Sequence, residues 1–206
     1  MIKNMVLFLC LGYTTPFFAT PAVVIMIRHG EKEIMRNSFC KKVYVKNKKG
    51  KQEPIYTPYL SVKGHERANA LVPYFVMDSQ NTIFGQPVAI FASGPAKAGG
   101  SMRPIDTILP TVKAFGLEVQ AQYTAEEYKD LAEHIMTNKE FDGKYIIISF
   151  EHHHIPLLAH AMGVKQAPHS WPEVFDRAWV TKFDKHGKVL SFENKPQRLL
   201  YGDSKR

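Results

Sequence analysis

The sequence predicts an α/β fold in three layers: a mostly parallel sheet with helices on both faces, plus a C-terminal β-hairpin. Three apolar runs, residues 23–27, 88–92 and 145–150, have the length and composition of strands buried on both faces. Segments with helical spacing lie between these runs, an alternation typical of parallel sheets. Near the C-terminus, two strand-like segments flank residues 184–187, whose Asp-Lys-His-Gly sequence predicts the turn of the hairpin.

The elements follow in order along the chain. After the first run, residues 33–58 have little periodicity, which predicts an excursion near the site or a small hairpin. Ser61 is a suitable N-cap for a helix. The apolar positions of that helix recur at helical spacing, at Ala68, Leu71, Val72 and Phe75. The run 88–92 is followed by a glycine-rich loop over residues 94–102.

The second half continues the same alternation. Pro104 suits the first turn of a helix that runs to residue 114 and ends at Gly116. Residues 117–122 alternate and predict a strand, and residues 124–127 fit a capping box before a further helix. After the third run, residues 155–161 predict a helix that Gly163 ends. Residues 178–183 and 189–192 then form the hairpin.

The composition predicts one ordinary globular domain over residues 21–206. Hydrophobic residues make up 45% of the 206 residues and charged residues 22%. The net charge of +8 is compatible with nucleic acid as a partner. However, the lysines concentrate in residues 41–51, which predict a solvated loop or hairpin, and no nucleic-acid motif accompanies them. We therefore expect no nucleic-acid partner, and a positive field would also attract a phosphorylated substrate.

The N-terminus has the pattern of a secretory signal peptide over residues 1–20. Lys3 supplies the positive start, residues 5–11 the apolar stretch, and residues 16–22 a small-residue exit. Pro16 makes the segment too short and broken for a good spanning helix, so no stable membrane span is expected after its removal. An uncleaved anchor or a buried segment is the alternative. Cleavage predicts a secreted or periplasmic protein that loses Cys10 and keeps Cys40 without an intrachain partner.

Arg28, His29 and Gly30 directly follow the first apolar run. In open α/β sheets, ligands bind beyond the carboxyl ends of the strands. The arginine is always charged and its fork fits phosphate, while the histidine can be a nucleophile near neutral pH. Gly30 lets the backbone turn and approach a ligand closely. This triplet therefore predicts a phosphate site.

Later segments add polar residues in a matching order. Ser93 follows the second run, Arg103 follows its loop, and the third run ends in a glutamate and three histidines, residues 151–154. With these in order, the chain resembles the histidine phosphatase superfamily, which includes phosphoglycerate mutases and acid phosphatases. The resemblance covers about residues 23–164 and implies that His29 is phosphorylated and then hydrolysed. It also implies that Arg28, Arg103 and a second histidine bind the phosphoryl group.

Which of the three adjacent histidines is this second histidine is open. Counting back from Ile155 to the pattern of related strand ends favours His152, with His153 as the alternative. Neighbouring residues of a strand end point to opposite sides, so the three histidines are not all expected to line the pocket. Gly30, Glu31, Ser93 and His153 are the further expected substrate contacts. No metal or cofactor is expected, since three adjacent histidines cannot close a tetrahedral metal site without other ligands.

The general acid is the open part of the site. Its candidates are Glu126, Glu127 and Glu151, with Glu31 as a further one, and Glu127 has a competing role in the capping box. Glu66 and Arg67 lie on a predicted helix and are expected to be surface charges.

Together these features predict a secreted, metal-independent phosphatase that hydrolyses a phosphomonoester through a phosphohistidine. Its substrate would be a phosphorylated small molecule or a phosphoprotein. Three alternatives stay open: a phosphomutase, a catalytically weak phosphate-binding homologue, and a basic nucleic-acid or surface binder driven by the lysine segment.

Overall fold

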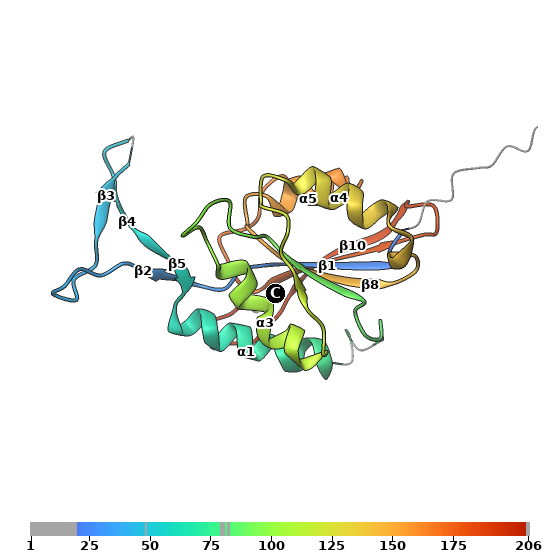
Figure 1. The fold of residues 1–206 in the computed structure, drawn as a ribbon, viewed down its shortest axis with the longest axis horizontal. Coiled ribbons are helices and arrows are strands. Elements are labelled where there is room, and N and C mark those ends of the chain that lie inside the picture. The colour runs from blue at the N-terminus through green and yellow to red at the C-terminus, as the bar shows by residue number, and fades with distance from the viewer. Residues whose placement is uncertain (1–19, 48, 79–80, 82, 205–206) are drawn as a thin grey trace, which may run out of the picture.

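The computed structural model describes residues 20–47, 49–78, 81 and 83–204. The predicted signal peptide therefore lies outside the described residues, except for Thr20. A six-stranded sheet forms the centre of the molecule, in the order β10-β9-β1-β8-β6-β7 (Figure 1). Four strands are parallel: β1 (Val23–Arg28), β8 (Tyr145–Phe150), β6 (Ala89–Ala92) and β7 (Val119–Gln120). The other two, β9 (Arg177–Phe183) and β10 (Val189–Pro196), form the antiparallel hairpin. The predicted mostly parallel sheet and the C-terminal hairpin are confirmed.

Strands β1, β6 and β8 are buried along their whole length, as their uninterrupted apolar sequences predict. The register pairs Ile25 with Ile147 and Arg28 with Phe150, so β1 and β8 end together. Strand β7 is shorter than the predicted 117–122, because only its two residues pair with β6.

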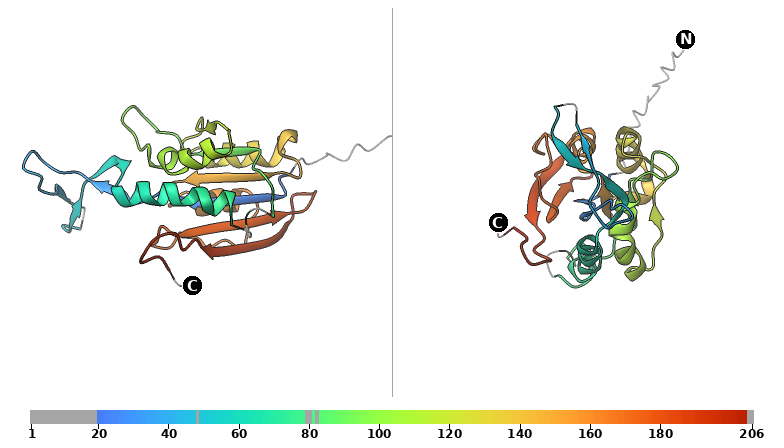
Figure 2. Two further views of the ribbon diagram at one scale, coloured as in Figure 1. Left: turned by 90° about the horizontal axis from the view of Figure 1, so that it is seen from below. Right: turned by 90° about the vertical axis from the view of Figure 1, so that its left-hand side faces the viewer.

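Helices cover both faces of this sheet (Figure 2). Helices α1 (Val62–Val76) and α3 (Arg103–Ala114) lie on one face, and α4 (Tyr128–Thr137) and α5 (Ile155–Ala161) on the other. A short 3-10 helix, η1 (Lys139–Phe141), precedes β8. Side chains of β1 alternate between the two layers: Ile25 packs in the core under α1 and α3, while Met26 packs under α4 and α5. The three-layer prediction is confirmed.

The helix ends follow local signals in the sequence. The Ser61 hydroxyl accepts a hydrogen bond from the Gly64 amide at 3.1 Å and caps α1. Gly116 follows α3 with a φ of 67°, a left-handed conformation that glycine adopts without strain. Only half of the predicted capping box forms before α4. The Glu127 carboxylate accepts from the Thr124 amide, but the Thr124 hydroxyl donates to the same carboxylate instead of accepting from the helix.

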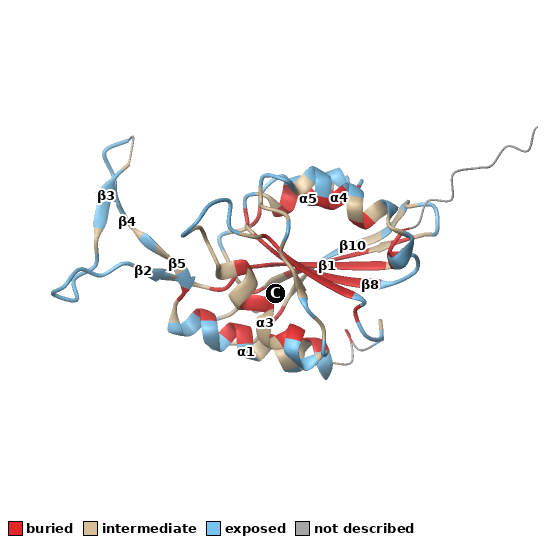
Figure 3. Cartoon of the chain, in the orientation of Figure 1, coloured by how far each residue is buried: buried red, intermediate tan, exposed pale blue. Residues whose placement is uncertain are grey.

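Residues 32–60, here called the arm, project from the sheet as two small antiparallel pairs (Figure 1). Strand β2 (Lys32–Ile34) pairs with β5 (Tyr56–Leu60) at the base, and β3 (Tyr44–Lys46) pairs with β4 (Gln52–Pro54) further out. The outer pair is largely exposed (Figure 3). The predicted excursion and its lysine-rich hairpin are therefore confirmed.

Within the described residues, no helix combines the length and apolarity needed to cross a membrane.

Candidate active site

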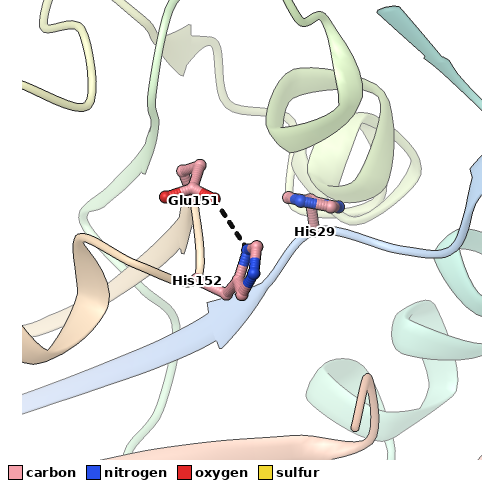
Figure 4. A group of neighbouring side chains, drawn as sticks. All are labelled: His29, Glu151 and His152. Carbon is pink, nitrogen blue, oxygen red and sulfur yellow. Dashed lines mark ion pairs between the residues drawn. The ribbon is translucent and has the colours of Figure 1, made fainter. Parts of the chain in front are cut away.

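The paired ends of β1 and β8 bring the predicted chemical residues to one edge of the sheet (Figure 4). His29 follows β1, and its amide donates to the Phe150 carbonyl at 3.2 Å. Glu151 and His152 follow Phe150 directly. Two parallel neighbours that end together therefore place His29 beside His152, although 123 positions separate them in the sequence.

His29 is buried and electrically neutral. Its side chain is 1% exposed, and its Nδ1 lies 2.7 Å from the Gly30 carbonyl oxygen. A carbonyl only accepts, so Nδ1 carries the proton and Nε2 keeps a free lone pair. Nε2 is buried and has no hydrogen-bond partner among the described residues. Burial lowers the pKa of His29 to about 3, and the nearby Arg103 and Arg28 act in the same direction. The free nitrogen is thus available as a nucleophile.

Arg28 and Arg103 are held by backbone carbonyls. Nη1 of Arg28 donates to the Val174 carbonyl at 3.1 Å, and its guanidinium lies 4.0 Å from the centre of the Phe175 ring. Nη1 of Arg103 donates to the Thr57 carbonyl at 2.8 Å. The Nε atoms of both arginines are buried without a partner in the described part of the chain. Each guanidinium thus has a fixed position and free N–H groups for an anion.

Gly30 contacts both helices that cover this face of the sheet, α1 and α3. Its amide donates to the Thr107 hydroxyl at 2.7 Å, and that hydroxyl donates to the Arg103 carbonyl at 2.7 Å. A Cβ at Gly30 would lie 3.0 Å from the Gly64 carbonyl oxygen, and one at Gly64 would lie 2.5 Å from the Glu31 carbonyl oxygen. Glycine at both positions therefore permits the close approach of the His29 loop to α1.

The three histidines have different surroundings. His152 is 7% exposed, its ring centre lies 5.9 Å from that of His29, and its Nδ1 lies 2.7 Å from Glu151 Oε1. His153 is exposed, and its ring packs on the His152 ring at 3.8 Å. Nδ1 of His154 lies 3.0 Å from Glu151 Oε2, and its ring faces Tyr128. Of the three rings, the structure places that of His152 against His29.

Glu151 and Glu127, two of the carboxylates expected as general acids, have hydrogen-bonding or ion-pair partners within the protein. Although burial favours the protonated form of Glu151, hydrogen bonds from His152 and His154 hold its pKa far below the usual range. Glu127 is exposed, and the Thr124 amide and hydroxyl lower its pKa. Glu126 is exposed on the same turn. Ionised carboxylates of low pKa are poor proton donors, so the geometry does not favour Glu151 or Glu127 as the general acid.

Glu31 forms a buried ion-pair network instead of facing a ligand. Its oxygens accept from Arg67 Nε at 3.0 Å and Nη2 at 2.8 Å, and Arg67 also bonds Asp203 through two nitrogens. Arg67 is 2% exposed, so the expectation of a surface charge is wrong there, whereas Glu66 is exposed as expected.

Ser93 is buried after β6, and its amide donates to the Ser149 carbonyl.

Two hollows adjoin the site. One, of about 420 Å³, includes His152, His153 and Glu173 in its lining. Glu173 has the largest electrostatic influence of any carboxylate on Arg28. The other, of about 260 Å³, lies where the arm base meets the 94–102 loop and includes Lys32 and Arg103. Sequence reasoning missed Glu173, Phe175 and Thr107, because no motif or spacing in the single sequence marks them.

His29, Glu151 and His152 also have the residue types of a metal site, with one ligand atom from each within 4.8 Å of the others. However, zinc ligands about 2.0–2.1 Å from a tetrahedral ion lie roughly 3.3 Å from each other. The 2.7 Å between Glu151 Oε1 and His152 Nδ1 is the distance of a direct ion-pair contact instead. Arg28, Arg103 and Lys32 also lower the pKa of His29, and this positive field disfavours a further cation. The group therefore fits an anion better than a metal ion.

No protein-family model matches the chain, and no curated protein does. Several solved structures do. An Agrobacterium tumefaciens structure described as phosphohistidine phosphatase SixA is 14% identical, with a TM-score of 0.49 over 84% of this chain and 97% of that one. A mycobacterial glucosyl-3-phosphoglycerate phosphatase is 14% identical, with a TM-score of 0.47 over 85% and 97%. A Bacillus anthracis phosphoglycerate mutase is 11% identical, with a TM-score of 0.47 over 86% and 93%. The function is therefore inferred from the site itself.

Proposed function

We propose that this protein is a phosphoric monoester hydrolase of the histidine phosphatase type, with His29 as its nucleophile. One observation carries the proposal: a buried, neutral histidine has its free Nε2 among two arginines and a second buried histidine. Phosphoryl transfer needs positioning and stabilisation of charge on the peripheral oxygens, and the two arginines supply both. The reaction is proposed to need no metal ion or cofactor.

The first step transfers the phosphoryl group to the enzyme. His29 Nε2 forms a bond to phosphorus while the bond from phosphorus to the ester oxygen breaks, and the leaving oxygen takes up a proton. Arg28, Arg103 and His152 bind the phosphoryl oxygens. In the second step, water attacks phosphorus and passes one proton back to the group that protonated the leaving oxygen. The N–P bond breaks, and inorganic phosphate leaves with His29 neutral again.

The proton for the leaving group needs a separate source, because the carboxylates of Glu151 and Glu127 are stabilised in their ionised form. The proposal assigns it to Glu173, which lines the hollow beside His152. Glu173→Gln should slow hydrolysis of an alkyl phosphate much more than that of an aryl phosphate, whose leaving group needs no acid. Equal losses on both substrates would remove Glu173 from this role.

The decisive experiment is trapping of the phosphoenzyme. The protein is mixed with an aryl phosphate, quenched in alkali, and mapped by mass spectrometry, with His29→Asn as the matched variant. We expect an alkali-stable phosphohistidine on His29 and phosphate release that His29→Asn abolishes. Turnover that persists in His29→Asn would refute the covalent mechanism.

A phosphate-binding homologue of low activity is the second candidate, favoured by the low pKa of two of the predicted acids, Glu151 and Glu127. It predicts saturable binding of inorganic phosphate without turnover of any phosphomonoester.

For the phosphatase, we further propose a secreted or periplasmic location, with a phosphorylated small molecule or phosphoprotein as substrate.

A further inference from the structure

The arm carries most of the net charge of the protein. Its residues 32–60 include eight Lys and Arg residues and two Glu residues, so its net charge is +6 out of +8 for the whole chain. Six of these cations are described and exposed, and none forms an ion pair with a described carboxylate: Arg36, Lys41, Lys42, Lys46, Lys49 and Lys51. The charge is therefore concentrated on a projection, where the described cations have no carboxylate partner in the described part of the chain.

Two turns of the same design form the ends of the arm. In the first, the Asn37 side-chain oxygen accepts from the amides of Phe39 and Lys41, each at 3.0 Å. In the second, the Asn47 side-chain oxygen accepts from Lys49 at 2.9 Å and Lys51 at 3.0 Å. Such side-chain bonds fix the backbone of a turn. These bonds therefore hold the backbone amides of Phe39, Lys41, Lys49 and Lys51, whose residues are exposed.

Apolar side chains accompany these cations on the surface. Phe39, in the first turn, is 79% exposed, and Val45 and Tyr44 of β3 are 53% and 48% exposed. Arg36 and Lys41 flank Phe39, and the Arg36 guanidinium donates to the Cys40 carbonyl across the same turn. An exposed aromatic side chain surrounded by basic residues fits a lipid bilayer, which has an apolar interior beneath anionic headgroups.

We propose that the arm is a membrane-docking element: its lysines bind anionic phospholipid headgroups, and Phe39 inserts among them. Seven of the eight cations are lysines, compact point charges that suit a diffuse anionic surface. Arginine, whose fork reads individual phosphates and bases, occurs once. The arm begins directly after Glu31, so docking holds the catalytic edge of the sheet toward the lipid (Figures 1 and 3).

The test is co-sedimentation of the full chain with vesicles of phosphatidylcholine alone, or of phosphatidylcholine and phosphatidylglycerol in equal parts. Each lysine near a charged surface contributes roughly fivefold to binding, so the double variant Lys41→Glu/Lys42→Glu should bind at least roughly thirtyfold more weakly. Phe39→Ser should weaken binding by about tenfold. Lys165→Glu/Lys185→Glu makes the same charge change at exposed sites outside the arm and should change binding far less.

Three results would overturn the proposal. The first is no binding to the anionic vesicles at low ionic strength, where charge attraction is strongest. The second is an equal loss of binding in the control pair, which would reduce the effect to net charge. The third is tighter binding to a single-stranded oligonucleotide than to the vesicles, which would assign the arm to nucleic acid. Unchanged thermal transitions verify that all variants are folded, independently of any phosphatase activity.

Discussion

Replacement of His152 by alanine tests how the phosphoryl group is held. His152 is 7% exposed, and its ring lies edge-on to that of His29. Its removal takes one preorganised group from the site, a loss that costs roughly 3–4 kcal/mol of transition-state stabilisation. Turnover should therefore fall by about two to three orders of magnitude. The thermal transition should move little, because Glu151 keeps His154 Nδ1 and the His153 amide as partners.

The neighbouring histidines provide the matched controls. His153 is exposed, and its ring packs on the ring of His152 instead of that of His29. His153→Ala leaves the amide bond to Glu151 in place and should lower turnover by less than about tenfold. His154→Ala removes one hydrogen bond from Glu151 and should also have a small effect. His152→Asn, which keeps a donor, should recover part of the loss.

The assay is steady-state hydrolysis of an aryl phosphate, with kcat and KM determined separately for each folded variant. If His153→Ala is the severe change, the register of the second histidine is off by one residue. If all three alanine variants are mild, the arginines alone hold the phosphate, and a phosphate-binding protein describes the molecule better.

The pKa of His29 is about 3 in the folded protein against an ordinary 6.5, so its contribution to stability is complete above about pH 6.5 and is lost as the pH falls toward 3. Urea unfolding at several pH values should therefore show a smaller acid-side loss in His29→Asn. A chelator should leave turnover unchanged, and loss that zinc restores would contradict the anion site. Arg67→Met leaves the Glu31 and Asp203 carboxylates without their partner and should cost roughly 3–5 kcal/mol in denaturant unfolding. Gly64→Ala brings a Cβ to 2.5 Å from a backbone oxygen and should lower the free energy of unfolding by about 1–3 kcal/mol, seen as a lower Tm.

The parts of the fold that local chemistry determines could be predicted from the sequence. The run before Arg28 has no polar position, which predicts a strand with both faces covered, and Ser61 and Gly116 mark helix ends through bonds within a few residues. The strand ends then predicted which chemical groups meet, because parallel strands place their carboxyl ends at one edge. His29 and His152 follow from this rule.

Features that depend on distant partners could not be predicted. Arg67 has the sequence context of a surface charge, but it is buried because Glu31 lies 36 positions before it and Asp203 lies 136 after it. Phe175, which stacks on Arg28, comes from a segment without regular periodicity. A charge is buried when partners reach it from elsewhere in the fold, and a single sequence does not contain that information.

The way charges are paired explains why the site stays positive. Arg28 and Arg103 are positioned by the neutral carbonyls of Val174 and Thr57, which fix the guanidiniums without neutralising them. The acids that flank the same strand ends bond elsewhere: Glu31 pairs with Arg67, and Glu151 with the histidines that follow it. Had either carboxylate paired with Arg28 or Arg103, it would occupy the place of a phosphate oxygen and weaken the positive field that adds to the effect of burial on His29. Separate partners for the acids and the arginines therefore keep the arginines free for the proposed anion site.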